Sequence, residues 1–599
     1  DRGQLAMAAG GGSTPRGFSL GDAALVSVIL LLSLGRLAST ALSNVNASSS
    51  TRAPGTPPPG PLLHLRTTKG QGRAAGEDAL RAVRGLLGRV VPGAADAFVL
   101  EVIPRGAAQG DEFEVGDGAD GQVVLRGTDA ISLCSALHWY LKYSCNASIS
   151  WTGDRGLDAL TRPLPPVATA DRGVRRRRLV PVSYYMNTVT ASYSMVWWRW
   201  ERWEREIDWM ALNSINLPLA MTGQEYVWEQ VYAKLGIASS DLVNFFTGPA
   251  FQAWGRMGNL KAFGGPLPGS WRSQQFDLQR RILARMRDLG MTPVMPAFAG
   301  HVPGAFKAHF PQAAVTSGSR WKTFGPDECC VDVLEPTDPM FSRVGALFVQ
   351  EQARLLGTDH VYACDVYNEN TPPSRDPAYL RTVGRAIYDA MSAGDPEAVW
   401  VQQGWFQTDR WWDGAATAAF LSGPPPGRLL MLDLYSELQP FWAATDNYYG
   451  RPWVWCMLHN FGGTMGLYGD LSTIARGPYA AHVEAAGTMT GLGATMEGIG
   501  TNYVVYDLML ETPWRAEPAN VTAWLGRYAG RRYGGGGAAG ANATRAWEIL
   551  HGTSYGHMSG RAKKSLVESR PTLTTREHFS LDEGFLHFGG AAGGGSGGG

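Results

Sequence analysis

Residues 361–373 read VYACDVYNENTPP, and this stretch decides how the middle of the chain is expected to fold. The β-prone residues at its start predict a strand, and the Pro-Pro pair at its end predicts a turn. Asn368 and Glu369 stand between them, where the strand leaves the sheet. In a barrel of parallel strands the chemistry is carried out at the carboxyl ends of the strands. Glu369 is therefore a candidate catalytic acid, with a helix cap or an ordinary surface carboxylate as the alternatives.

Strand-like runs alternate with amphipathic helical patterns on both sides of this stretch. Eight such runs occupy residues 178–185, 215–221, 292–298, 360–367, 398–404, 428–434, 453–458 and 492–496. Eight strands alternating with helices over residues 178–505 are the pattern of a (β/α)8 TIM-type barrel, which places the catalytic region in the α/β class.

Most of these runs end in carboxylates, amides or aromatic rings. Glu497 follows the eighth run, and strands four and eight lie across a closed barrel from each other, so Glu369 and Glu497 are expected to face one another. Glu437 is the strongest rival for the second carboxylate, and Asp365 is placed to point inward and orient the acid. Two carboxylates in an aromatic-lined barrel mouth are the minimum required for glycoside hydrolysis.

Composition and missing motifs narrow the chemistry further. The chain has 53 Lys and Arg against 53 Asp and Glu, so no excess of charge favours nucleic acid or a membrane surface as a partner. A serine-hydrolase elbow, a dinucleotide fingerprint and a Cys/His metal cluster are all absent, and neither a cofactor nor a metal is expected. The 21 Trp favour a large aromatic core together with some sugar-stacking rings.

The regions around the barrel differ in composition. Residues 1–42 contain an apolar run at 23–34 followed by small residues, which predicts a signal peptide or other targeting region, with a signal anchor as the runner-up. No stable membrane span is expected. Residues 43–73 are predicted to be a disordered linker, 74–165 a small α/β domain, 506–588 a partial α-helical domain and 589–599 a Gly-rich tail.

Glycosylation sequons and cysteines bear on the compartment. The sequons agree with a secretory route that ends in a lysosome, a vacuole or the extracellular space, and they lie at Asn46, Asn146, Asn520 and Asn542. Cys134 and Cys145 are candidates to pair across a short loop. The adjacent Cys329 and Cys330 are not expected to pair with each other.

Several long motifs occur in order along the chain. They read WERWEREIDWMALNSINLPLAMTGQE (200–225), FFTGPAFQAWGRMGNL (245–260), GMTPVMPAFAGHVP (290–303), QGWF (403–406), WCMLHNFGG (455–463) and MEGIGTN (496–502). With VYNENTPP, they make residues 74–570 closely resemble the α-N-acetylglucosaminidases of glycoside hydrolase family 89. The resemblance implies a retaining exo-glycosidase that removes terminal, non-reducing, α-linked N-acetylglucosamine from glycans by double displacement. It also implies a small N-terminal α/β domain, a (β/α)8 barrel and an α-helical C-terminal domain.

The resemblance assigns roles to particular residues. It implies that Glu369 is the acid/base and Glu497 the nucleophile. It further implies a sugar pocket made of Asn187, Tyr193, Trp254, Met257, Trp321, Asn368, Trp405, Leu458 and Phe461. Asn368 also has a physical case, because an amide beside the acid can hydrogen-bond the substituent at C2 of the sugar.

The chain departs from the family pattern in three places. Val189 stands where close relatives carry Cys, Met496 stands where Pro is frequent, and a short tail after residue 571 replaces a long helical region. The shortened helical domain motivates a second hypothesis, a catalytically inactive carbohydrate-binding protein on the same scaffold. A glycosidase of different specificity is a third. The expected partner is a glycan with terminal α-linked N-acetylglucosamine, and the sequence is compatible with both a monomer and a homo-oligomer.

Overall fold

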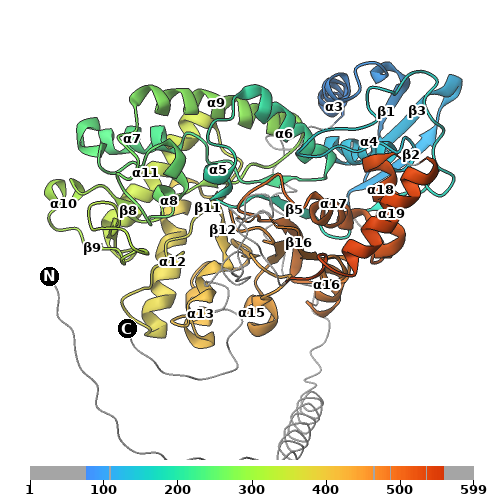
Figure 1. The fold of residues 1–599 in the computed structure, drawn as a ribbon. Helices are drawn as coiled ribbons and strands as arrows, with labels where there is room; N and C mark the ends of the chain where they lie inside the picture. The colour runs from blue at the N-terminus through green and yellow to red at the C-terminus, as the bar shows by residue number, and fades with distance from the viewer. Residues whose placement is uncertain are drawn as a thin grey trace, which may run out of the picture. The chain divides into compact units, whose positions relative to one another are not determined.

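The computed structural model describes residues 76–106, 110–462, 464, 466–485, 487–534 and 536–558, which are drawn in colour in Figure 1. The targeting region, linker and Gly-rich tail expected at 1–42, 43–73 and 589–599 lie outside the described residues. Asn46 and the stretch 559–588 also lie outside them.

Eight parallel strands form the centre of the described chain and close into a barrel. They are β5 (Val182–Tyr185), β6 (Leu217–Pro218), β7 (Met295–Pro296), β11 (Val361–Ala363), β12 (Val399–Gln403), β13 (Leu429–Asp433), β14 (Trp453–Met457) and β16 (Met489–Ala494). The sheet order runs β6-β5-β16-β14-β13-β12-β11-β7, and a parallel bridge between Leu219 and Val294 joins its two ends. The strands therefore follow chain order around the barrel, and the predicted (β/α)8 architecture is confirmed.

The barrel strands are apolar because side chains on both of their faces are buried. Every residue of β12 (VWVQQ), β13 (LLMLD) and β14 (WVWCM) is buried. Parallel strands covered by helices on the outside and by packed side chains on the inside have this continuous pattern. Trp400, Trp453 and Trp455 are among the largest fully buried side chains, so part of the high tryptophan content belongs to the core.

Helices cover the outside of the barrel, as Figure 1 shows. The longer ones are α6 (Trp200–Leu212), α7 (Gln224–Lys234), α9 (Gly269–Asp288), α11 (Pro339–Leu356), α12 (Pro377–Gly394), α13 (Gly414–Leu421), α16 (Leu471–Glu484) and α17 (Tyr503–Glu511). α12 shows why they form where they do. Its N-cap Asp376 accepts the backbone N–H groups of Ala378 and Tyr379, and Pro377 occupies the first helical position, where a missing N–H costs nothing.

Short elements in the connections shape the mouth of the barrel. They are α5 (Thr190–Tyr193), α8 (Gln252–Arg256), α10 (Phe306–His309), α14 (Phe441–Ala444), α15 (Asp446–Gly450) and β15 (Gly469–Asp470), which pairs with β17 (Gly556–His557). A three-stranded antiparallel sheet of β8 (His301–Val302), β10 (Asp332–Leu334) and β9 (Val315–Ser317) lies in the connection between β7 and α11. The loop between β9 and β10 contains Trp321.

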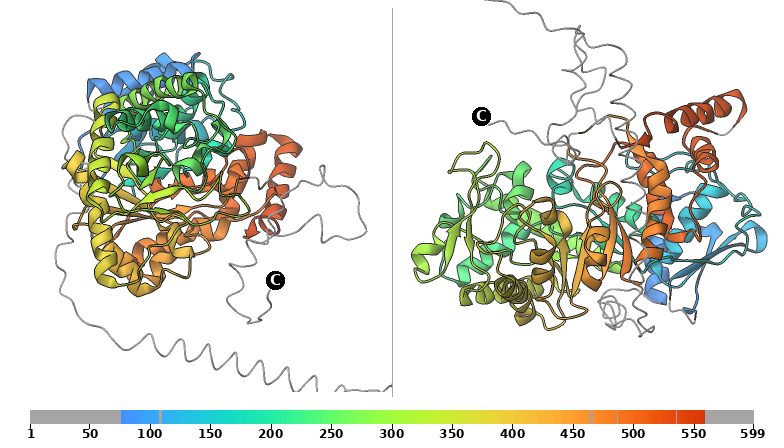
Figure 2. Two further views of the ribbon diagram at one scale, coloured as in Figure 1. Left: turned by 90° about the vertical axis from the view of Figure 1, so that its left-hand side faces the viewer. Right: turned by 90° about the horizontal axis from the view of Figure 1, so that it is seen from below.

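A small α/β region precedes the barrel. It contains α3 (Glu77–Val90), β1 (Phe98–Val102), β2 (Glu112–Asp117), β3 (Val123–Gly127), α4 (Ala130–Tyr143) and β4 (Arg176–Arg177), with sheet order β1-β3-β2-β4. α4 is buried along almost its whole length because the sheet lies on one side of it and α6 on the other. The right-hand view of Figure 2 shows α18 (Val521–Tyr533) and α19 (Gly537–His551) next to this region.

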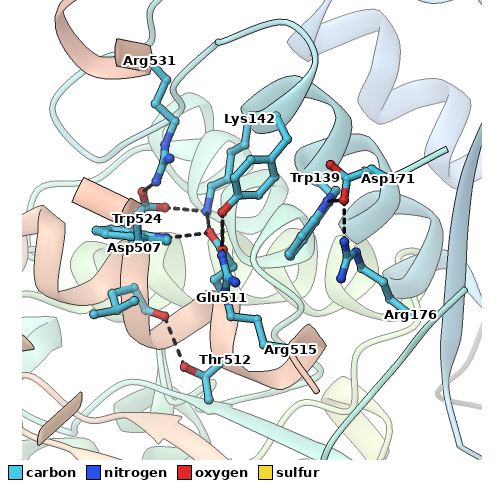
Figure 3. A network of polar contacts seen from close by, with 12 residues as sticks. Trp139, Lys142, Asp171, Arg176, Asp507, Glu511, Thr512, Arg515, Trp524 and Arg531 are labelled. Carbon is cyan, nitrogen blue, oxygen red and sulfur yellow. Dashed lines mark hydrogen bonds and ion pairs between the residues drawn. The ribbon is translucent and has the colours of Figure 1, made fainter. Parts of the chain in front are cut away.

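A buried network of charges joins the N-terminal region, the barrel and the C-terminal helices (Figure 3). Lys142 of α4 lies 2.6 Å from Asp507 and 3.2 Å from Glu511 of α17. Arg531 of α18 pairs with Asp507 at 2.6 Å, and Arg515 pairs with Glu511. These pairs fix α17, the helix that follows the strand leading to Glu497, against the two neighbouring regions.

Both predictions about the cysteines are wrong. Cys134 and Cys145 are free thiols. The segment between them is mainly the helix α4 rather than a loop, and eleven residues at 1.5 Å each place the two about 16 Å apart, far beyond disulfide reach. Cys329 and Cys330 form a disulfide with each other. Cys330 has a φ of 60°, which is a left-handed backbone conformation.

Candidate active site

The two candidate catalytic glutamates follow the fourth and the eighth barrel strand. Glu369 comes six residues after the end of β11 and is exposed. Glu497 comes three residues after the end of β16 and is half-buried. Regular strand β11 is shorter than the predicted 360–367, because the chain leaves the ladder after Ala363 and continues as a loop toward Glu369. Both glutamates lie at the carboxyl-end face of the barrel, on opposite sides of the strand order.

Two hydrogen-bond donors hold one oxygen of Glu369. Trp321 Nε1 donates to Oε2 over 2.5 Å, and Asn259 Nδ2 donates to the same oxygen over 2.8 Å. An indole N–H can only donate, so Oε2 is an acceptor in both hydrogen bonds. The hydroxyl oxygen of a carboxyl group is a poorer acceptor than its carbonyl oxygen, so this arrangement favours Oε1 as the oxygen that holds a proton. Sequence analysis did not identify Asn259, although it lies inside the quoted 245–260 motif.

Asn259 follows a short helix, α8, whose end is held by a buried ion pair. Arg256, at the end of α8, forms a bidentate pair with Glu225 of α7 over 2.8 and 3.0 Å, and both side chains are buried. The turn that follows packs directly on His301. Gly258 has a φ of 76°, and a Cβ there would lie 2.0 Å from His301 Nε2, so the turn requires glycine.

Aromatic rings form a wall that runs from Glu369 toward the loop of Glu497. The ring centroids of Trp321 and Trp254 are 6.5 Å apart, and those of Trp254 and Tyr193 are 5.4 Å apart in an edge-to-face arrangement. Tyr193 in turn covers Gly462, where a Cβ would lie 2.2 Å from its ring. Trp254 and Trp321 are half-buried and Tyr193 is exposed, so each ring keeps surface that a sugar can stack on.

Asn368 and Met257 lie together on the same side as Glu369. The Asn368 amide donates to Met257 Sδ over 3.5 Å, and Asn368 is buried beside the exposed acid. A thioether is a weak acceptor, so this amide can exchange it for a stronger oxygen acceptor on a ligand.

A second group of pocket residues gathers at the ends of the fifth, sixth and seventh strands. Trp405 and Phe461 lie with ring centroids 6.2 Å apart, and Phe461 meets Tyr435 edge-to-face at 5.7 Å. Leu458 belongs to the same cluster and is fully buried, so its part is to support the rings. Neighbouring Gly462 links this group to the aromatic wall through Tyr193.

Asn187 contacts the strand that leads to Glu497. Its Nδ2 donates to the carbonyl of Thr495 over 3.1 Å, and its Oδ1 accepts the N–H of Val189. Of the nine predicted pocket residues, Asn187 therefore holds the backbone before Glu497, and Asn368 and Met257 form a pair beside Glu369. The other six belong to the two aromatic groups, which are Tyr193, Trp254 and Trp321 in one and Trp405, Leu458 and Phe461 in the other. Their contact with a sugar stays a prediction.

Glu437 was the alternative to Glu497 as the second catalytic carboxylate, and its hydrogen-bond donors are backbone groups. It is buried, and its carboxylate accepts the backbone N–H groups of His459 and Leu458 over 2.6 and 3.2 Å. Burial raises its pKa to about 8. A carboxyl group held in this way fixes the chain after β14, and this geometry favours Glu497 over Glu437 as the second catalytic carboxylate.

Asp365 does not orient Glu369 as expected. Its carboxylate accepts hydrogen bonds from Gln402 Nε2, Gln403 N and Gln403 Nε2 of the next strand, all between 2.8 and 2.9 Å. Burial raises its pKa to about 6. The short strand β11 explains the difference, because the backbone leaves the ladder after Ala363, so Asp365 and Glu369 do not alternate along one regular strand.

No group of three or more His, Cys, Asp or Glu converges as a metal-ligand set in the part of the chain that the structure describes. The site consists of carboxylates, amides and aromatic rings. A closed barrel that carries two carboxylates, amides and aromatic rings at the carboxyl ends of its strands defines a class of protein, since glycoside hydrolases use such a pair of carboxylates.

Comparison with known proteins identifies the family. The family model described as the alpha-N-acetylglucosaminidase (NAGLU) tim-barrel domain matches residues 183–516, and the N-terminal and C-terminal domain models of the same family match 81–166 and 524–587. Human alpha-N-acetylglucosaminidase is 45% identical over 518 residues, which cover 84% of this chain and 68% of the human protein. The chain belongs to the α-N-acetylglucosaminidase family, glycoside hydrolase family 89.

Solved structures agree with this assignment. A family 89 glycoside hydrolase from Clostridium perfringens in complex with PUGNAc matches with a TM-score of 0.74 at 30% identity, covering 83% of this chain and 55% of that one. The same family's Clostridium enzyme in complex with 2-acetamido-1,2-dideoxynojirmycin matches with a TM-score of 0.75 at 29% identity, covering 86% and 57%. This chain thus spans little more than half the length of those enzymes.

Proposed function

We propose that this protein is a retaining exo-glycosidase that hydrolyses terminal, non-reducing, α-linked N-acetylglucosamine. The observation that carries the proposal is the exposed carboxylate of Glu369, which accepts two hydrogen bonds at Oε2 and follows the fourth barrel strand, while Glu497 follows the eighth. Family membership supports the sugar specificity. A Clostridium relative in the same family has been solved with its substrate GlcNAc-alpha-1,4-galactose.

The first step makes a covalent glycosyl-enzyme. Glu369 transfers the proton on Oε1 to the glycosidic oxygen, while a carboxylate oxygen of Glu497 attacks the anomeric carbon from the opposite face. The bond between the anomeric carbon and the glycosidic oxygen breaks, and the aglycone leaves as an alcohol. Trp321 and Asn259 stabilise the negative charge that develops on Glu369 because both donate to Oε2.

The second step releases the sugar. The ionised Glu369 accepts a proton from a water molecule, whose oxygen attacks the anomeric carbon, and the ester bond to Glu497 breaks. Two displacements at one carbon restore the original α configuration. Asn368 is adjacent to the acid and its amide donates to a thioether sulfur, a weak acceptor, so it is placed to bind the 2-acetamido group.

Hydrolysis of p-nitrophenyl α-N-acetylglucosaminide tests the proposal. The wild-type protein should release p-nitrophenol, and Glu369→Gln and Glu497→Gln should each lower kcat by at least about 1,000-fold without loss of the fold. Glu517→Gln, at an exposed glutamate, is the matched control and should retain full activity.

Two outcomes separate the other hypotheses. Sugar binding by the wild type without turnover would support the inactive carbohydrate-binding protein, and turnover of a different α-glycoside in a substrate panel would support another specificity. Full activity in Glu369→Gln or Glu497→Gln would reject the assignment of the two carboxylates.

We also propose that the protein enters the secretory pathway and acts in a lysosome, a vacuole or the extracellular space. The sequon residues Asn146, Asn520 and Asn542 are all exposed, which supports their use as glycosylation sites. Within the described residues, none of the helices has the length and apolar character needed to span a membrane. A loss of mass on treatment with a peptide N-glycosidase, abolished by changing all four sequon Asn, Asn46 included, to Gln, is the expected result in secreted protein.

A further inference from the structure

The segment 495–499, which carries Glu497, is bonded to its surroundings at successive peptide groups. The Thr495 carbonyl accepts from Asn187, and the N–H of Glu497 donates to the Asn460 carbonyl over 2.9 Å. Two further bonds come from α5 and from Ser194, its C-cap residue. Thr190 Oγ1 donates to the carbonyl of Met496 over 2.7 Å, and Ser194 Oγ accepts the N–H of Ile499 over 3.0 Å.

We propose that Thr190 and Ser194 are positioning residues that set the place and direction of the nucleophile Glu497. The inference rests on the proposed function. Neither residue has been assigned a role by the resemblance or by the pocket geometry above. Both act through the backbone, on the peptide groups directly before and shortly after Glu497.

Burial and a second hydrogen bond hold the Thr190 side chain in one position. It is completely buried, and its hydroxyl also accepts the backbone N–H of Asn187 over 3.1 Å, so both its donor and an acceptor site are used. A β-branched side chain has few rotamers, and these two bonds select one of them. Thr190 therefore couples the end of the first barrel strand to the end of the eighth.

Ser194 fixes the far side of the same loop. It lies one helical turn after Thr190, whose carbonyl accepts the Ser194 N–H over 3.0 Å, so both hydroxyls come from one rigid unit. A Cβ on Gly498 would lie 3.1 Å from the Gly462 carbonyl, so the loop has little room to shift toward β14. The hydroxyls of Thr190 and Ser194 hold the loop of Glu497 on one side, and the Gly462 backbone limits its movement on the other.

Such confinement matters because in-line attack at an anomeric carbon depends steeply on position. A displacement of about 1 Å in a catalytic group can cost about 100-fold in rate. Unlike a sugar-binding contact, backbone positioning should affect the chemical step more than substrate affinity.

The test uses Thr190→Val, Thr190→Ser and Ser194→Ala, with Thr445→Val as the matched control. Thr445 is also buried, and its hydroxyl likewise accepts a backbone N–H (Tyr448, 3.2 Å) and donates to a carbonyl (Phe441, 2.8 Å). It lies between α14 and α15, in the connection that follows the sixth barrel strand. Thr190→Val should lower kcat on the p-nitrophenyl substrate by about 10- to 100-fold with KM within about threefold. Thr190→Ser, which keeps the hydroxyl, should restore most of kcat.

Hydrogen exchange provides a readout that does not depend on turnover. Amides of 495–499 should exchange faster in Thr190→Val and Ser194→Ala than in the wild type, and should be unchanged in Thr445→Val. An unaltered kcat and unaltered exchange in Thr190→Val, or equal kinetic losses in Thr190→Val and Thr445→Val, would overturn the inference. If the wild type does not hydrolyse the substrate, the proposed function fails, and the exchange result still decides whether α5 holds this loop.

Discussion

Replacing Lys142 by Met should weaken the attachment of α17 to the regions on either side. Lys142 is 5% exposed, and it neutralises Asp507 and Glu511, which are 3% and 2% exposed. The Met side chain keeps the apolar stem and removes the charge. Asp507 would retain Arg531 and Glu511 would retain Arg515, so neither carboxylate would be left without a cation (Figure 3).

The structure sets the size of the effect. Removing one member of a buried ion pair costs about 3–5 kcal/mol, and the two remaining arginines place this case near 3 kcal/mol. An unfolding entropy of about 1 kcal/mol per kelvin, for a unit of roughly 480 residues, converts that loss into a fall in Tm of about 3 °C. Lys307→Met is the matched control, because Lys307 and Asp332 form a surface pair whose loss should cost about 0–1 kcal/mol.

The pH dependence of the free energy of unfolding provides a second test. Burial by itself would raise the pKa of Asp507 and of Glu511, but Lys142 and the arginines outweigh it and lower both below their ordinary values of 3.8 and 4.5. The stability they contribute is complete above those ordinary values and is lost only as the pH falls below them. The difference between Lys142→Met and the wild type should persist at pH 7 and pH 5 and narrow below about pH 4.

Scanning calorimetry of the wild type, Lys142→Met and Lys307→Met at these pH values makes the comparison. A Tm for Lys142→Met within about 1 °C of that for Lys307→Met would refute the reasoning. So would a difference that is larger at pH 3 than at pH 7.

Three further predictions concern the mouth of the barrel. Asn259→Ala removes one donor to Glu369 and should lower kcat/KM about tenfold, and an unchanged kcat/KM would show that Trp321 suffices. Burial lowers the pKa of His301 to about 4, below its ordinary 6.5, so its stabilising effect is complete above pH 6.5 and declines as the pH falls toward 4. The free energy of unfolding should fall between pH 7 and pH 5 by about 2 kcal/mol less in His301→Leu than in the wild type. Denaturant titrations at the two pH values measure this, and an equal fall in both proteins would contradict it. Gly258→Ala should cost more than about 2 kcal/mol, because its Cβ would overlap His301 and its φ is 76°; an unchanged Tm would count against the tight turn.

The barrel could be predicted from sequence because its signal is local. Runs such as VWVQQ and LLMLD are buried on both faces, and an alternation of such runs with amphipathic helices has few other solutions. The α/β character of residues 74–165 was predicted for the same reason, although the acidic residues of β2 weaken the strand pattern there.

The sequence by itself therefore determined the strand order, the helical layers and the strand ends at which Glu369 and Glu497 stand. Only the tertiary structure decided which side chains form hydrogen bonds with the residues at those strand ends. Asn259 reaches Glu369 across 110 residues, and Thr190 reaches Met496 across 306. Such contacts depend on the closure of the barrel, which brings together segments that no local pattern connects. In the closed barrel Asp365 accepts from Gln403 and Glu437 accepts from the backbone of His459. The residue expected to orient the acid and the rival second carboxylate therefore hold strand ends in place.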